Sequence, residues 1–179
     1  MPALLRNARE SDIPAIHGLL LELAQYEKLT DLFVANEEDL RDALFGPHPA
    51  IECLVAQWHE ARDPVERPTD SAADAASPVV AYALFFHNYS TFLGRRGLYL
   101  EDIYVQPGQR GRGIGKLLLQ RLAALAVERG CGRFEWTVLD WNQPAIDFYQ
   151  RLGAQVLPDW RVVRMTGDAL KQLADPAGA

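Results

Sequence analysis

Apolar and polar residues repeat along this chain with two different periods, which together predict a fold that mixes helices and strands. A helical period begins after Ser11, which we expect to cap the helix, and its buried stripe comprises Ile13, Ile16, Leu20, Leu23 and Ala24. A second helix is predicted at about 36–45, opened by Asn36 and closed by Gly46. Runs of β-forming residues predict strands at 4–9, 51–58 and 79–89, the last two as an antiparallel pair.

The second half of the chain inserts glycines between a strand and a helix. Residues 98–105 are rich in β-forming residues, the segment 110–115 reads Arg-Gly-Arg-Gly-Ile-Gly, and apolar residues at helical spacing follow it. Later elements are predicted as a strand at 133–138, a helix from Asn142 to Gly153, a strand at 161–165 and a terminal helix from about Thr166. The proline-rich stretch 59–78 lacks periodicity and is predicted to be a long loop within a single domain, 1–179.

Composition narrows the class of protein. The chain has 179 residues, of which 49% are hydrophobic, and this is enough for one domain with a core of its own. A formal net charge of −6 argues against nucleic acid and anionic membranes as partners and suits a cationic substrate. The histidines lack metal-ligand spacing, so no metal is expected. Without a signal-peptide pattern or a membrane-spanning apolar run, the expected location is cytoplasmic.

The glycine segment predicts a pyrophosphate site, because a strand–turn–helix junction aims unpaired backbone N–H groups and the positive end of a helix dipole at one point. A P-loop is excluded, since position 110 is not glycine and Leu117 stands where Ser or Thr is required. A dinucleotide fingerprint would need glycine where the chain has Lys116, which leaves it a weak alternative. A glycine turn without any ligand is the other alternative.

A third pattern, R-x-x-G-x-G at Arg110, Gly113 and Gly115, resembles the acetyl-CoA loop of the GNAT superfamily of N-acetyltransferases. The segment 142–154, an Asn followed by a short helix with Phe-Tyr and then Gly-Ala, resembles the second signature of that family. Further likeness to the spermidine/spermine N-acetyltransferase-like branch, including its thialysine relatives, lies in 22–29, 45–49, 53–56, 99–105 and 140–143. The resemblance implies a GNAT fold: an α/β (α+β) arrangement in which a mixed, mostly antiparallel twisted sheet is flanked by helices.

The resemblance also implies acetyl-CoA as the co-substrate and indicates which residues hold it. Backbone N–H groups of the strand after Asp102 would bind the pantetheine arm and polarise the thioester carbonyl, while the glycine turn would bind the phosphates. The implied set comprises Ile103, Tyr104, Val105, Arg110, Gly111, Arg112, Gly113, Ile114, Gly115, Lys116, Asn142 and Tyr149. The alternatives are that Asn142 is only a helix cap and that either arginine is a solvated loop charge.

Acetyl transfer to an amine needs a base, because a primary amine of pKa about 10.4 is mostly ammonium at neutral pH. Strand alternation puts Glu101 on the face of Tyr99, and Asp102 on the opposite face with Leu100 and Tyr104. The resemblance implies that Glu101 is the base, acting directly or through water, and that Asp102 helps to hold the cation.

A proton for the departing thiolate would come from Tyr149, which occupies the general-acid position of the family. Tyr149 shares an apolar helix face, so the alternative is a tyrosine that only packs in the core. For Glu101 and Asp102, the alternative is an ion pair with an arginine such as Arg95.

Amine recognition is assigned to Tyr26, Glu27, Phe92, Glu101 and Asp102, with an exposed acidic helix face as the alternative for Glu27. Polyamine-acetylating members tend to carry Asp and Trp where this chain has Ser90 and Phe92, so the likeness favours the thialysine branch.

We therefore expect an acetyl-CoA-dependent N-acetyltransferase that acts by direct transfer on a primary amine of a small cationic molecule, either thialysine- or lysine-like or a diamine or polyamine. The alternatives are a protein lysine or N-terminal acetyltransferase and a non-catalytic acyl-CoA-binding regulatory domain. Apolar residues of 156–163, a segment that family members use to pair, predict a homodimer.

Overall fold

A computed structural model of the chain describes residues 3–58 and 77–175. The chain divides into two compact units, Met1–Thr137 and Val138–Ala179. The loop predicted at 59–78 lies outside the described residues except for Ser77 and Pro78. That the whole chain forms one domain stays a prediction.

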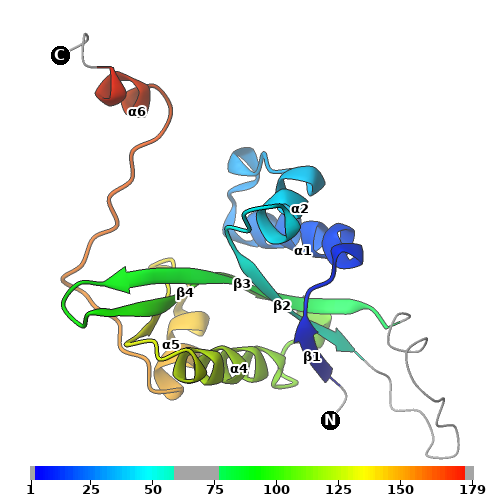
Figure 1. The fold of residues 1–179 in the computed structure, drawn as a ribbon. Helices are drawn as coiled ribbons and strands as arrows, with labels where there is room; N and C mark the ends of the chain where they lie inside the picture. Colours follow the sequence, from blue (N-terminus) through cyan, green and yellow to red (C-terminus); the bar gives the residue numbers. More distant parts are fainter. Residues whose placement is uncertain (1–2, 59–76, 176–179) are drawn as a thin grey trace, which may run out of the picture. The chain divides into compact units, whose positions relative to one another are not determined.

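A five-stranded sheet is the centre of the first unit (Figure 1). Its strands lie side by side in the order of the chain: β1 (Ala3–Asn7), β2 (Glu52–Trp58), β3 (Val79–Ser90), β4 (Arg95–Val105) and β5 (Phe134–Glu135). Neighbours from β1 to β4 are antiparallel, and β5 is parallel to β4. The predicted mixed, mostly antiparallel sheet is therefore confirmed, and the predicted strand at 133–138 is shorter than expected.

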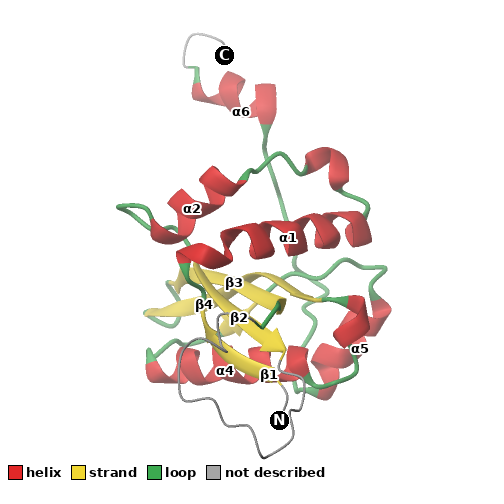
Figure 2. Ribbon diagram, turned by 90° about the vertical axis from the view of Figure 1, so that its right-hand side faces the viewer, coloured by secondary structure: helices red, strands yellow, loops and turns green. Residues whose placement is uncertain are grey.

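Helices cover both faces of this sheet. Figure 2 shows α1 (Ile13–Glu27) and α2 (Glu37–Phe45) on one face and α4 (Ile114–Glu128) on the other. The core between the sheet and the first two helices includes Ile16, Val55 and Tyr82, all of which are fully buried. The predicted helices are thus confirmed: α1 and α4 pack against the sheet, and α2 packs against α1 in the same core.

The helix starts differ in how they are capped. Asn36 caps α2 as predicted, since its Oδ1 accepts from the N–H groups of Glu38 and Asp39. The expected cap at Ser11 is wrong: Ser11 lies inside a 3-10 turn, Glu10–Asp12, which leads directly into α1. The reason is that the Asp12 carboxylate accepts a hydrogen bond of 2.7 Å from the Arg9 N–H, so Asp12 fixes the start of the helix where Ser11 was expected to do so.

The second unit contains α5 (Gln143–Arg151) and α6 (Gly167–Ala174). Gly153 ends α5 as predicted, with a φ of 94°. Asn142 stands at the start of α5 without a side-chain capping bond. The prediction of a strand at 161–165 is wrong. A strand needs a neighbouring strand to pair with its backbone N–H and C=O groups, and no strand in the described part of the chain pairs with this segment. None of the described helices is long and apolar enough to cross a membrane.

Candidate active site

A β-bulge interrupts β4 where the candidate base lies. Phe85 on β3 pairs with Leu100, but the next residue back, Leu84, pairs with Asp102, so Glu101 is an extra residue in the ladder. Such a bulge bends a strand, increases its twist and redirects side chains, and bulges are common next to active sites. The Glu101 side chain is accordingly exposed although β4 is an inner strand of the sheet.

The bulge also corrects the predicted alternation. Directly paired residues share a face of a sheet, and consecutive residues have opposite faces. Leu100 therefore lies on the face of Phe85, whose ring contacts Arg129 at the end of α4, and Asp102 lies on the face of Leu84, which packs in the α1 core. Leu100 and Asp102 were expected on one face and lie on opposite faces, because one inserted residue shifts the period-2 pattern.

Three carboxylates meet beside the bulge. Burial, with further contributions from the charges of Glu101 and Glu27, raises the pKa of Asp102 from 3.8 to about 6. Burial also raises the pKa of Glu27, which lies at the last turn of α1. None of the three carboxylates has an ion pair within the described residues, and Arg95, the alternative partner, pairs with neither Glu101 nor Asp102. Buried carboxylates without an ion pair are costly to keep, which marks Asp102 and Glu27 as candidates for a functional role.

Tyr82 adds an unexpected polar group to the same face of the sheet. Its ring is fully buried, its hydroxyl has no hydrogen-bond partner among the described residues, and burial together with the charge of Asp102 raises its pKa. The sequence gives no sign of this, since a tyrosine within an apolar strand reads as ordinary packing.

The C-terminal half of α1 is fixed to the end of β4 by Glu22. Its two carboxylate oxygens accept hydrogen bonds from the Tyr104 hydroxyl and from Gln106 Nε2, both at 3.1 Å. Glu22 thus holds the helix that carries Tyr26 and Glu27 against the strand that carries the other two carboxylates.

The glycine turn between β4 and α4 has the backbone of an anion site. Gly111 and Gly113 have φ values of 76° and 84°, and a Cβ added at either would meet no atom within 4 Å. Gly113 immediately precedes α4, whose first N–H groups have no partner within the helix. Ile114 is turned into the core, while Gly115 is partly buried and Lys116 is exposed.

The two arginines of the turn do not project freely into solvent. Arg110 Nε donates to the Val105 carbonyl at 2.9 Å, and its guanidinium carbon lies 5.0 Å from the Tyr26 ring centre. The Arg112 guanidinium lies 4.5 Å from the centre of the Trp58 ring. Both side chains are exposed as well as in contact with an aromatic ring, and their role toward the phosphates stays a prediction.

The edge of β4 that faces β5 is open over most of its length. The two strands pair only at Leu98 with Phe134 and at Tyr99 with Glu135. Gln106 N donates to Val80 O on β3. In an antiparallel ladder every second residue points its backbone groups at the same neighbour, so the Tyr104 backbone also faces β3, while the backbone groups of Ile103 and Val105 face the other edge of β4. The Val105 carbonyl already accepts from Arg110 Nε, which leaves the Ile103 backbone groups and the Val105 N–H for an amide-bearing ligand arm.

Other predicted site residues lie elsewhere. Phe92 is 99% exposed at the turn between β3 and β4, and the strand from Arg95 to Glu101 alone spans roughly 20 Å. Within one chain the structure does not bring Phe92 to the carboxylates. Asn142 and Tyr149 belong to the second unit, where Tyr149 contacts Phe148 with ring centres 5.5 Å apart. The roles of all three stay predictions.

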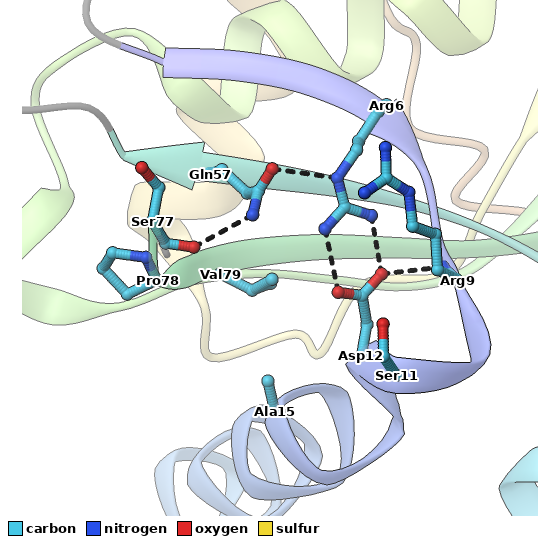
Figure 3. A pocket seen from close by; sticks show the side chains of 9 residues that line it. All are labelled: Arg6, Arg9, Ser11, Asp12, Ala15, Gln57, Ser77, Pro78 and Val79. Carbon is cyan, nitrogen blue, oxygen red and sulfur yellow. Dashed lines mark hydrogen bonds and ion pairs between the residues drawn. The ribbon is translucent and has the colours of Figure 1, made fainter. Parts of the chain in front are cut away.

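A pocket of about 390 Å³ lies at the opposite end of α1 (Figure 3). In it, Arg6 forms two hydrogen bonds to Asp12, of 2.6 and 2.8 Å, and a third to Gln57 Oε1 of 2.9 Å. Gln57 in turn donates to the Ser77 carbonyl. The polar groups of this pocket satisfy one another, which is typical of a structural network.

Comparison with known proteins identifies the family. The model of the acetyltransferase (GNAT) family matches residues 26–154. The chain belongs to the GNAT acetyltransferase family. It is 41% identical over 174 residues to the thialysine N-epsilon-acetyltransferase of Bos taurus, covering 96% of each chain. It is 38% identical over 199 residues to an L-ornithine N5-acetyltransferase of Arabidopsis thaliana, covering 94% of this chain and 86% of that one.

A solved structure agrees with this assignment. An integron cassette protein from the mobile metagenome of V. cholerae superposes with a TM-score of 0.74 at 25% identity, covering 97% of this chain and 98% of that one. The expectation of an N-acetyltransferase enzyme with the GNAT fold is thereby confirmed, and the acetyl donor of the family is acetyl-CoA.

The residues of this acetyltransferase fit the donor that its family uses. The open glycine turn leaves space for a phosphate against the backbone, where a Cβ would narrow the approach. The outer edge of β4 offers the Ile103 backbone groups and the Val105 N–H to an amide-bearing arm. No metal-binding group of His, Cys, Asp and Glu occurs among residues 3–58 and 77–175.

Proposed function

We propose that this acetyltransferase moves the acetyl group of acetyl-CoA to the primary amine of a small cationic amino acid or short diamine, in preference to spermine. The carboxylate cluster of Glu101, Asp102 and Glu27 is the observation that carries the proposal, since these acids have no cation of their own among the described residues. The thialysine and ornithine specificities in the names of the relatives support a substrate of this size.

In this proposal Glu101 is the base. The exposed carboxylate at the bulge accepts a proton from the substrate ammonium, directly or through water, and the neutral amine then attacks the thioester carbonyl. Asp102 and Glu27 hold the positive charge of the substrate, and the N–H groups at the outer edge of β4 steady the developing oxyanion. Tyr149 returns a proton to the departing thiolate.

The distance from the acids to the turn between β3 and β4 supports a short substrate. That turn, where Ser90 Oγ accepts the Leu93 N–H, lies roughly 20 Å along β4 from the acids and gives a distal ammonium no partner within one chain. A long polyamine carries further ammonium groups, each of which needs a partner to leave water without loss. Thialysine and ornithine place their charges within reach of one acidic cluster.

We also propose that the enzyme is a homodimer that pairs through residues 156–165. Trp160, Val162 and Val163 are between 71 and 93% exposed in the second unit. Exposed apolar side chains in one continuous segment mark an interaction surface, and a second copy is the commonest partner. Sedimentation at micromolar concentration should give the dimer mass, and a monomer would contradict this.

A panel of amines tests the function. Release of CoA thiol from acetyl-CoA is followed with thialysine, ornithine, putrescine, spermidine, spermine and a lysine-containing peptide. We expect kcat/KM for thialysine or ornithine to exceed that for spermine by about 5- to 150-fold, the range for one or two changed contacts. A tenfold preference for spermine or spermidine would overturn the substrate assignment, and activity confined to the peptide would favour a protein acetyltransferase.

A further inference from the structure

Arg110 connects the glycine turn with the helix that carries the amine-binding residues. Its Nε donates to the Val105 carbonyl at 2.9 Å, and its guanidinium carbon lies 5.0 Å from the Tyr26 ring centre and 5.4 Å from the Tyr104 ring centre. At these distances the planar cation is attracted to both ring faces. Arg110 therefore contacts α1, the last strand residues and the turn at the same time.

Tyr104 extends this contact into α1. While its ring contacts Arg110, its hydroxyl donates to Glu22, which also accepts from Gln106. Tyr26 lies one helical turn beyond Glu22, and Glu27 follows directly. An unbroken series of contacts thus leads from the proposed phosphate turn to the proposed amine site.

A direct phosphate contact would use Arg110 differently. To point its N–H groups at a ligand in the turn, the side chain would leave the Val105 carbonyl and the two rings that now hold it. The backbone N–H groups at Gly113 and after it are positioned for an anion without this change.

We propose that Arg110 is a positioning residue that couples the two substrate sites, so that occupation of the glycine turn orders the Tyr26–Glu27 end of α1 and tightens amine binding. The inference rests on the proposed function of both sites. Coupling of this kind is reciprocal, because each ligand changes the affinity of the other by the same factor.

Calorimetry with CoA and thialysine measures the coupling without turnover, because CoA carries no acetyl group. In the wild type we expect saturating CoA to tighten thialysine binding about fivefold or more, within the usual range of coupling. In Arg110→Gln the factor should fall to about one, while the affinity for CoA alone changes by less than about threefold. Arg121→Gln is the matched control, since Arg121 is exposed on α4 and pairs with Glu128.

Two results would overturn the proposal. One is a wild type without coupling; the other is an Arg110→Gln protein that binds CoA tenfold or more weakly and keeps the coupling, as expected of a phosphate ligand. Should Arg110→Gln fail to fold, Tyr26→Leu removes the aromatic ring, keeps an apolar side chain and must also lose the coupling.

Hydrogen exchange separates this proposal from the proposed function. If the wild type neither binds nor acetylates thialysine, the substrate assignment fails, but CoA alone should still slow exchange of the backbone amides at 22–27. Arg110→Gln should abolish that slowing and Arg121→Gln should keep it. Equal slowing in all three proteins would overturn the coupling role.

Discussion

The carboxylates at the two ends of α1 differ in whether they have a cationic partner. At the first end, Asp12 is buried but receives two hydrogen bonds from Arg6 and one from the Arg9 backbone. At the other end, Glu27 and Asp102 lie close together without a cation among the described residues. Burial acts on the pKa of Asp12 as well, yet its bonds to Arg6 and Arg9 outweigh burial and lower that pKa, whereas the pKa of Asp102 is raised.

This difference separates a structural acid from an acid arranged for a ligand. A buried ion pair that satisfies itself has no remaining affinity for a substrate, although removing one partner is strongly destabilising. Unpaired acids lower stability, and proteins keep such groups mainly where function requires them. The pocket at Asp12 contains the Arg6–Asp12 pair, whereas Asp102 and Glu27 have no ion pair among the described residues.

The largest expected effect comes from breaking the paired end. Asp12→Ala removes the carboxylate partner of Arg6, whose side chain is mostly buried, and should lower the free energy of unfolding by about 3–5 kcal/mol at pH 7. The difference between the variant and the wild type should shrink as the pH falls through the lowered pKa of Asp12. At that pH the wild-type carboxylate becomes protonated, so the wild type also loses the stability that the charged Asp12 contributes. Urea unfolding from pH 7 down to pH 3 measures this. Glu10→Ala, at an exposed acid that pairs with Arg41, is the control and should cost less than about 1 kcal/mol.

Removing the proposed base should have the next largest effect, on rate instead of stability. Glu101→Gln should reduce turnover by roughly 10²-fold, or about 2.7 kcal/mol of barrier, and leave urea unfolding unchanged. Steady-state kinetics at saturating thialysine provides the test. Near wild-type turnover would remove Glu101 from the mechanism.

A third variant should reverse the stability effect seen at Asp12. Because the folded pKa of Asp102 is about 6 and its ordinary value is 3.8, the folded state holds its proton more tightly, so stability falls as the pH rises from about 4 to about 6. Asp102→Asn should therefore stabilise the protein by roughly 2–3 kcal/mol at pH 7, hardly at all at pH 3.5, and raise the KM for the amine. Equal stability changes at both pH values would contradict an unpaired Asp102.

The smallest expected effect concerns the hydroxyl beside the acids. Tyr82→Phe removes a buried hydroxyl that has no partner among the described residues, so it should stabilise the fold by about 1 kcal/mol. Thermal unfolding measures the change, with Tyr89→Phe, at an exposed tyrosine, as the control. A loss of stability would mean that the hydroxyl of Tyr82 has a partner, such as a buried water.

Local sequence signals predicted most of the elements but not the contacts that shape the site. Asn36, with three acids after it, is a sufficient helix start, and the glycine segment forms a turn between β4 and α4 as predicted. The bulge at Glu101 could not be predicted from the sequence. Both faces of β4 carry buried apolar side chains, so the apolar pattern looks the same whether or not the strand register shifts by one residue.

One further error and one missed contact have related causes. The segment 161–165, with two adjacent valines, reads as a strand, but strand formation depends on a neighbouring backbone that no local pattern encodes. The phosphate role of Arg110 stays a prediction from a motif, and the motif gave no sign of the contact with Tyr26, 84 residues earlier. Long-range contacts of this kind decide what a site residue touches.

The short pairing between β4 and β5 has a consequence for the life of the protein in the cell. An exposed strand edge is a template on which other chains can add, and protein quality control responds to such edges. A ligand that occupies the edge stabilises the folded state by mass action. If acetyl-CoA binds at this edge, as proposed above, its supply would influence how much of this enzyme survives as well as how fast it works.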